Sequence, residues 1–301
     1  MLNLLAVTHK IFQTKHLIIV GVCLVLIVGL FLLSRKLSFS NVCKIMFYVG
    51  IVSEAVKIFY YIVQNEKTHG GMLPKTDLPF HLCSIQILFI AVVNFSKNEK
   101  LKRFLLSFMY PSCLIGGIAA IFIATNSSLN GTWVITVQYF LYHVAIVVLA
   151  LNICTRKEQR LELSDYVNCL KFLVILMFAA VYINSIVDDG DHKVNFMYVV
   201  SPPQSGLPFL HENHGWLVYI AHYACLILLC VTLCYIKPII VGIKKKAAEK
   251  RLAQSSEAVI EEGKTEGAAQ SAAQPTAQPA AAEAVAETTG AEVAATQGSD
   301  E

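Results

Sequence analysis

Residues 78–95 read LPFHLCSIQILFIAVVNF, and this run decides the class of the fold. It is apolar over nearly the length that crosses the ~30 Å hydrocarbon core of a bilayer, for which a helix needs about 20 residues. Asp77 is suited to the N-cap of such a helix, and Pro79 is suited to its first turn. A cysteine, Cys83, lies just inside the expected helix start.

Six other stretches are apolar over a similar length. With residues 78–95 the predicted spans are His16–Leu33, Val42–Gln64, Leu78–Phe95, Phe104–Thr125, Thr132–Ile153, Val167–Val187 and Trp216–Ile236. The sequence is 55% hydrophobic and 15% charged, with a mean hydropathy of +0.58, whereas a soluble domain carries about 25% charged residues. We therefore predict an all-α, polytopic membrane helix bundle with seven transmembrane helices over residues 16–236.

Basic residues predict how the bundle is oriented. They follow every odd-numbered span, as Arg35, Lys36, Lys44, Lys97, Lys100, Lys102, Arg103, Arg156, Lys157, Arg160, Lys237, Lys244, Lys245, Lys246, Lys250 and Arg251. The other side carries only Lys10, Lys15, Lys67, Lys75 and Lys193. Because short cytoplasmic loops are enriched in Lys and Arg, residues 1–15 are expected to be extracytoplasmic and the C-terminus cytoplasmic. In a bacterium, the membrane would be the plasma (cytoplasmic) membrane.

The C-terminal segment, residues 237–301, has a different composition. It is basic at first and then acidic and rich in Ala, Gln and Glu, with no aromatic residue after about Ala247. Such a sequence buries too little apolar surface to offset its ordering entropy. We predict a disordered cytoplasmic tail, whose basic start lies against anionic headgroups.

Several function classes find no support in the sequence. A net charge of +3, scattered along the chain, does not indicate nucleic-acid binding. There is no C-x-x-C pair, no Cys/His zinc spacing and no Gly-rich phosphate loop, so neither a metal nor a cofactor is expected. The cysteines lie in or against apolar stretches, where they act as small hydrophobic residues, and a disulfide framework is not expected.

Cys83 is the candidate nucleophile. Helix amides at the start of the third span favour its thiolate, and His143, inside another span, could serve as its base. His81 lies two residues away and points elsewhere, so we interpret it as an entrance residue, whereas Gln86 is three residues on and shares the face of Cys83. Inert packing explains the thiol equally well, and a hydrogen bond to a neighbouring helix explains the histidine.

Depth in the membrane tests this pairing. Counted from the expected helix starts, Cys83 lies roughly 6–8 Å deep and His143 about 16 Å deep. A direct pairing therefore requires the third span to begin deeper in the membrane than residue 78, or His143 to reach upward.

Other polar residues extend the candidate site. Glu54 and Lys57 are three residues apart in the second span. Either Glu54 is a carboxylate of the site, or the two residues form a structural ion pair. Asn184 lies in the sixth span. Asn195 and Tyr198 belong to an apolar segment, Asn195–Val200, that we expect to dip back toward the membrane and form a pocket wall.

The His-Leu-Cys segment at 81–83, the histidine at 143, and Asn-Phe-Met-Tyr with a following Pro at 195–202 together resemble the YwaF-like, transmembrane protein 164-like family of integral membrane proteins. The resemblance covers about residues 16–236. It implies a cysteine-dependent acyltransferase that moves a fatty acyl chain onto lysophospholipids. Mapped by motif, the catalytic pair would be Cys83 and His143.

Two hypotheses follow. The first is a lipid acyltransferase that holds an acyl thioester on Cys83, with membrane phospholipids as its partners and with Gln86, Asn195 or Glu54 orienting the substrate or His143. The second is a non-enzymatic carrier or sensor, in which a polar ligand pocket is lined by Glu54, Lys57, His143 and Asn184, and Cys83 is a packing residue.

Overall fold

The computed structural model describes residues 13–64, 73–124, 128–129, 131–190, 194–202, 210 and 215–272, with side chains to residue 255. Its helices are α2 (Thr14–Ser34), α3 (Phe39–Gln64), α4 (Leu82–Phe95), α5 (Glu99–Phe122), α7 (Trp133–Thr155), α8 (Leu163–Val187), α9 (Trp216–Cys234) and α10 (Ile236–Ala272). Short 3₁₀ turns are η1 (Lys75–Asp77), η2 (Lys157–Gln159) and η3 (Phe196–Tyr198). No strand occurs among these residues, and the all-α prediction is confirmed.

Five helices are long and apolar enough to cross a membrane, namely α2, α5, α7, α8 and α9. The other two predicted spans are also helical. However, α4 has only 14 residues, and α3 carries the charged residues Glu54 and Lys57 within its length. The chain is therefore a helical membrane protein with several apolar spans.

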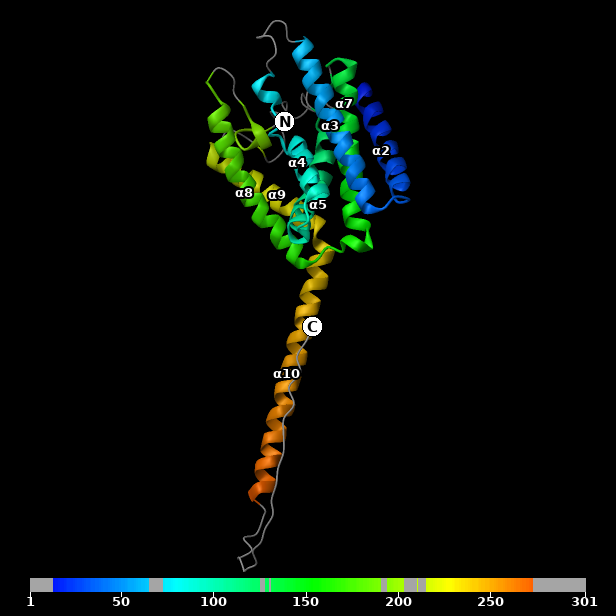
Figure 1. Cartoon of the computed structure of the whole chain (residues 1–301). Coiled ribbons are helices and arrows are strands. Elements are labelled where there is room, and N and C mark those ends of the chain that lie inside the picture. The colour runs from blue at the N-terminus through cyan, green and yellow to red at the C-terminus, as the bar shows by residue number, and fades with distance from the viewer. Residues whose placement is uncertain are drawn as a thin grey trace, which may run out of the picture. The chain divides into compact units, whose positions relative to one another are not determined.

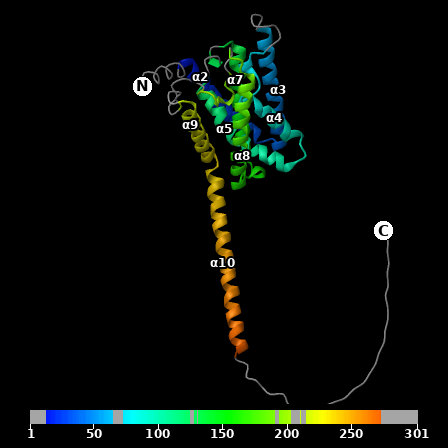
Figure 2. The same ribbon diagram turned by 90° about the vertical axis from the view of Figure 1, so that its left-hand side faces the viewer.

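Two helices, α5 and α7, form the centre of the bundle. They pack closely against each other; α2 and α3 pack on α7, and α4 and α8 pack on α5. In both views α4 lies beside α3 and α5 (Figures 1 and 2). Gly117 permits the central approach, because a Cβ there would lie 3.2 Å from the backbone oxygen of His143 and would clash with Val147.

The third predicted span differs from the helix that forms. The prediction began the span at Leu78, but α4 begins at Leu82. Leu78 is held extended (φ −58°, ψ 149°) before Pro79, as steric contact with a proline ring favours. His81 is also extended and forms the N-cap. The helix is therefore shorter, and its start lies deeper in the bundle.

A proline in the central helix α5 is accommodated by a distant tyrosine. Pro111 lacks an N–H, so the carbonyl of Ser107, four residues earlier, loses its helical donor. The hydroxyl of Tyr235, at the junction of α9 and α10, donates to that carbonyl at 2.6 Å. Tyr235 is fully buried. This bond joins the end of α9 to the centre of the bundle.

The chain divides into two compact units, residues 1–246 and 247–301. The structure differs from the predicted disordered tail, because α10 continues through the second unit as far as Ala272. Ala, Glu, Lys and Gln all have high helix propensity. The prediction considered only the missing apolar face, and the side chains of residues 247–255 are indeed exposed. Residues 273–301, and residues 1–12 of the predicted outer N-terminus, lie outside the described residues.

We predict that Tyr235→Phe destabilises the bundle. The substitution keeps the ring but leaves the Ser107 carbonyl without its donor, which should lower the free energy of unfolding by about 1–3 kcal/mol. Thermal unfolding in detergent measures the change. Tyr182→Phe, at a tyrosine that is 68% exposed on α8, is the matched control. Equal effects of the two substitutions would contradict the role given to Tyr235.

Candidate functional site

Cys83 is the second residue of α4 and lies among the first amides of the helix. The first amides of an α-helix have no partner within the helix, so at this position the sulfur lies beside N–H groups that are free to donate. Such a position stabilises a sulfur anion. The thiol is partly buried among core residues. Its proton must therefore pass to a protein base before the anion forms.

A hydrogen bond holds the start of α4 against the middle of α7. The hydroxyl of Tyr142 donates to the carbonyl of Cys83 at 2.7 Å. Tyr142 is the residue before His143 and is itself buried. The first turn of α4 therefore lies within the reach of one tyrosine side chain from the turn of α7 that carries His143.

His143 is oriented by its own helix. It is only 4% exposed, and its Nδ1 lies 2.7 Å from the carbonyl oxygen of Tyr139. A carbonyl only accepts hydrogen bonds, so Nδ1 carries the hydrogen and the lone pair of the neutral ring is on Nε2. Nε2 is therefore the atom that can take a proton.

Tyrosine rings surround this histidine. The ring of Tyr139 has its centroid 4.2 Å from that of His143, and the ring of Tyr142 lies at 6.0 Å. Both tyrosines also lie within electrostatic range of the Cys83 sulfur. No hydrogen bond joins Cys83 to His143 among the described contacts. Tyr139 thus interacts with both members of the predicted pair.

The segment after α8 returns into the bundle, as predicted for Asn195–Val200. Side chains of α8 and α9 satisfy its backbone. Asn184 accepts from the N–H of Phe196 at 2.7 Å and donates to its carbonyl at 3.1 Å. The carbonyls of residues 197–199 accept from Tyr223 (2.9 Å), Tyr219 and Trp216 (2.9 Å), respectively.

This segment packs beside the N-terminus of α4. The ring of His81 lies 5.1 Å from that of Phe196 and 6.0 Å from that of Tyr198, and Tyr198 is within electrostatic range of Cys83. Met197 and Tyr198 have φ values of 56° and 54°. A left-handed backbone is costly for such residues and persists only where the surroundings impose it.

Two of the predicted orienting residues, Asn184 and Asn195, hydrogen-bond to the backbone of this segment. Asn195 donates to the carbonyl of Ser201 at 2.7 Å, and its own carbonyl oxygen accepts from the N–H of Val200 at 3.1 Å. Asn184 uses both ends of its amide on Phe196. The structure therefore assigns structural roles to Asn184 and Asn195.

Glu54 and Lys57 form the ion pair that their spacing allowed, at 2.7 Å. Lys57 also donates to the carbonyl of Asp77 at 3.0 Å, which fixes the turn before α4. Burial raises the pKa of Asp77, and the charge of Lys57 opposes that rise. Glu54 does not orient His143, whose Nδ1 bonds to Tyr139. Lys57 is close enough to interact electrostatically with Cys83.

Gln86 lies one turn below Cys83 and leaves an acceptor free. Its Nε2 donates to Ser112 Oγ at 2.9 Å. Its Oε1 is buried and has no hydrogen-bond partner among the described residues, and the same holds for Thr136 Oγ1 on α7. A buried acceptor without a donor is costly. Gln86 therefore remains available to a hydroxyl that enters beside Cys83.

His81 is the N-cap residue of α4, and its role as an entrance residue stays a prediction. Its Nε2 is 3.2 Å from the carbonyl of Thr76. The sequence analysis did not single out the donors on α9. The sequence nevertheless contained a pattern that indicates these donors. Trp216, Tyr219 and Tyr223 repeat at helical spacing on one face, and each side chain can donate a hydrogen bond.

A comparison with known families gives one match. The TMEM164 family model matches residues 11–235, a range that contains every candidate site residue and ends before α10. No curated protein and no solved structure matches the chain significantly.

We predict that Asn184→Ala releases the returning segment, because the N–H and the carbonyl of Phe196 both lose their partner. The free energy of unfolding should fall by about 2–3 kcal/mol. Amide hydrogen exchange should rise over residues 194–201. Ser185→Ala is the control, since Ser185 is exposed and bonds only within its own helix. Unchanged exchange in Asn184→Ala would show that other contacts hold the segment.

Proposed function

Because the chain belongs to the TMEM164 family, we propose that it is a membrane-embedded lipid acyltransferase with Cys83 as nucleophile and His143 as base. One observation supports the proposal: the Tyr142–Cys83 bond joins the first turn of α4, which carries the thiol, to the turn of α7 that carries His143, whose Nδ1 bonds to its own helix and leaves Nε2 as the proton acceptor. In the bundle proposed here, all seven apolar helices cross the membrane, with the N-terminus outside. The site then opens toward the outer leaflet of the plasma membrane.

The first half of the reaction forms a thioester. His143 Nε2 takes the proton of the Cys83 thiol, and the thiolate attacks the ester carbonyl of a phospholipid. The amides at the start of α4 stabilise the oxyanion of the tetrahedral intermediate. Its collapse breaks the bond to the glycerol oxygen, and the imidazolium returns the proton to that oxygen. A lysophospholipid leaves, and the acyl chain remains on sulfur.

The second half transfers the chain. The hydroxyl of a second lipid gives its proton to His143 Nε2 and attacks the thioester carbonyl. The carbon–sulfur bond breaks, and the sulfur recovers the proton from the imidazolium. The apolar surroundings of Cys83 exclude water, which would otherwise hydrolyse the thioester. Gln86 Oε1, one turn deeper, is a suitable acceptor for the incoming hydroxyl.

Two neighbours support this chemistry without reacting. Lys57, which pairs with Glu54, donates to the carbonyl of Asp77 and so fixes the turn before α4. Tyr139 holds Nδ1 of His143 through its carbonyl and packs its ring on the imidazole. We assign both as positioning residues. Closure of the site on a lipid would bring Nε2 within reach of the thiol, as apo catalytic contacts often tighten on binding.

We predict that Cys83→Ser and His143→Gln both impair acyl transfer. Purified protein incubated with a phospholipid labelled in its acyl chain should acquire a hydroxylamine-sensitive label on Cys83, and Cys83→Ser should acquire none. His143→Gln should lower the labelling rate by about 10²–10⁴-fold, since it removes the base.

Cys225→Ser is the matched control, because Cys225 is an exposed cysteine on α9. The Cys225→Ser protein should acquire the acyl label on Cys83 at the same rate as the unaltered protein. Full transfer activity in Cys83→Ser would remove the mechanism. If Glu54→Gln abolished uptake of a solute while Cys83→Ala had no effect, the carrier hypothesis would replace it.

A further inference from the structure

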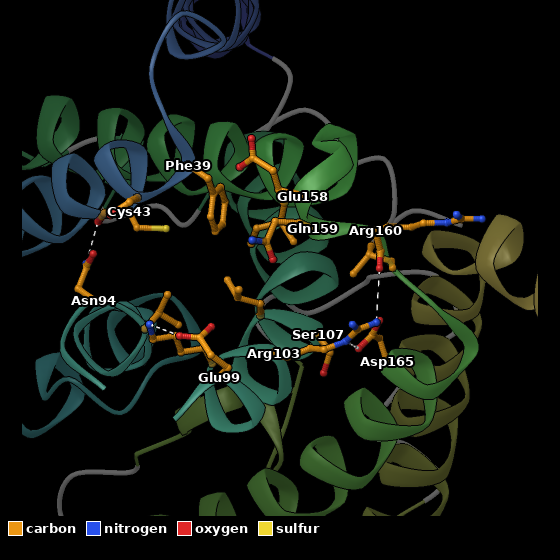
Figure 3. A pocket seen from close by; sticks show the side chains of 16 residues that line it. Phe39, Cys43, Asn94, Glu99, Arg103, Ser107, Glu158, Gln159, Arg160 and Asp165 are labelled. Atoms are coloured by element: carbon orange, nitrogen blue, oxygen red, sulfur yellow. Dashed lines mark hydrogen bonds and ion pairs between the residues drawn. The ribbon is translucent and has the colours of Figure 1, made fainter. Parts of the chain in front are cut away.

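A cavity lies at the other end of α4 from Cys83. Its volume is about 380 Å³, within the range of small-molecule sites. It is framed by the start of α3, the end of α4, the start of α5, the end of α7 and the η2 turn (Figure 3). Asn94, on its wall, lies about 16 Å along α4 from Cys83 at 1.5 Å per residue. The cavity is therefore separate from the thiol site.

The cavity has both apolar and polar lining. Its buried apolar side chains are Phe39, Cys43, Val93, Leu106 and Ile153. Asn94 stands beside them with its amide fixed, because Nδ2 donates to the carbonyls of Cys43 and Ile90 at 3.0 Å each. Its Oδ1 has no donor among the described residues and remains an acceptor for a ligand.

Charges of both signs line the cavity in equal number. The acids are Glu99, Glu158 and Asp165, and the bases are Lys102, Arg103 and Arg160. Asp165 is only 1% exposed and takes two bonds of 2.9 Å from Arg103. This pair is fixed and forms a rigid part of the wall.

The remaining charged residues are more exposed than Asp165. Lys102 and Glu99 pair at 2.8 Å, with side chains 24% and 81% exposed, so solvent screens the pair. The carboxylate of Glu158 has no ion-pair partner among the described residues. These residues thus offer a cation to an anionic group and carboxylates to a cationic group of the same ligand.

The hydrogen-bond acceptors of the cavity favour one kind of cationic group in the ligand. Carboxylates and the amides of Asn94 and Gln159 bind a group that has N–H donors. A quaternary ammonium is bound by a cage of several aromatic rings, whereas Phe39 is the single aromatic residue among the side chains lining this cavity. For the anion, Lys102 is a point charge of the kind that binds phosphate.

We propose that this cavity binds a zwitterionic head group in which a phosphate is joined to a primary ammonium. The phosphate lies at Lys102, and the ammonium lies among Glu158, Glu99 and Asn94. The cavity is at the end of the bundle where basic residues gather, and lipid headgroups are found at that level of a membrane protein. A phosphatidylethanolamine of that leaflet and a free phosphoethanolamine compound share this chemistry.

The test uses the full chain with Cys83→Ser, so that lipid turnover cannot alter the sample and the result does not depend on acyl transfer. Thermal unfolding is measured in nanodiscs made with equal fractions of phosphatidylethanolamine, phosphatidylcholine or phosphatidylglycerol. A parallel titration adds soluble glycerophosphoethanolamine to protein in phosphatidylcholine nanodiscs. Ligand binding raises the unfolding temperature by mass action.

We expect the highest unfolding temperature with phosphatidylethanolamine. Lys102→Gln and Glu158→Gln should each abolish the difference between lipids, measured within each variant, whereas Lys100→Gln, at an exposed lysine outside the cavity, should keep it. A rise with the soluble compound identifies the free molecule as a ligand, and a rise confined to the lipid identifies the membrane as the source. Two results would overturn the proposal. One is equal unfolding temperatures in all three lipids together with no rise on adding glycerophosphoethanolamine; the other is a difference between lipids that persists in Lys102→Gln.

Discussion

The short reach of α4 is the constraint on which the candidate site depends. The helix begins at Leu82, and the hydroxyl of Tyr142 fixes its first turn to the middle of α7 at 2.7 Å. A helix that began at the membrane surface would have left its cysteine well above the histidine. Because α4 starts deeper, the space above it must be filled by non-helical chain, and two segments fill it. One leads through η1 into α4, and the other is the returning segment at η3.

Non-helical backbone inside a membrane protein needs a hydrogen-bond partner for every polar group. The returning segment meets this requirement with side chains from its neighbours, since Asn184 serves both backbone groups of Phe196 and α9 supplies three donors in a row. Lys57 does the same for the carbonyl of Asp77. Polar side chains in a membrane helix are costly to remove from water. Here they hydrogen-bond to the two non-helical segments near Cys83. The same principle explains Pro111, whose missing N–H is compensated by Tyr235.

Much of the fold was predictable, because hydrophobic runs of membrane length leave few alternatives to helices. All seven predicted spans are helical, and the spacing of Glu54 and Lys57 was sufficient to predict their ion pair. The start of α4 was missed because Pro79 is compatible both with a first helical turn and with the extended chain that forms. The roles of Asn184 and Asn195 depend on which backbone groups lie within reach, and one sequence does not contain that information. In the C-terminal segment, high helix propensity extends α10 to Ala272, although the side chains of residues 247–255 are exposed and the composition had predicted disorder.

The central claim is that the Cys83 sulfur and the His143 side chain face the same small space. Cross-linking measures this directly in a chain whose other cysteines are replaced by alanine or serine. With His143→Cys added, a short bifunctional thiol reagent should join it to Cys83 in membranes, whereas Ile153→Cys, about 15 Å further along α7, should not be joined. If the residue at 153 cross-linked to Cys83 and the residue at 143 did not, α4 would not begin level with the middle of α7, and the proposed catalytic pair could not form.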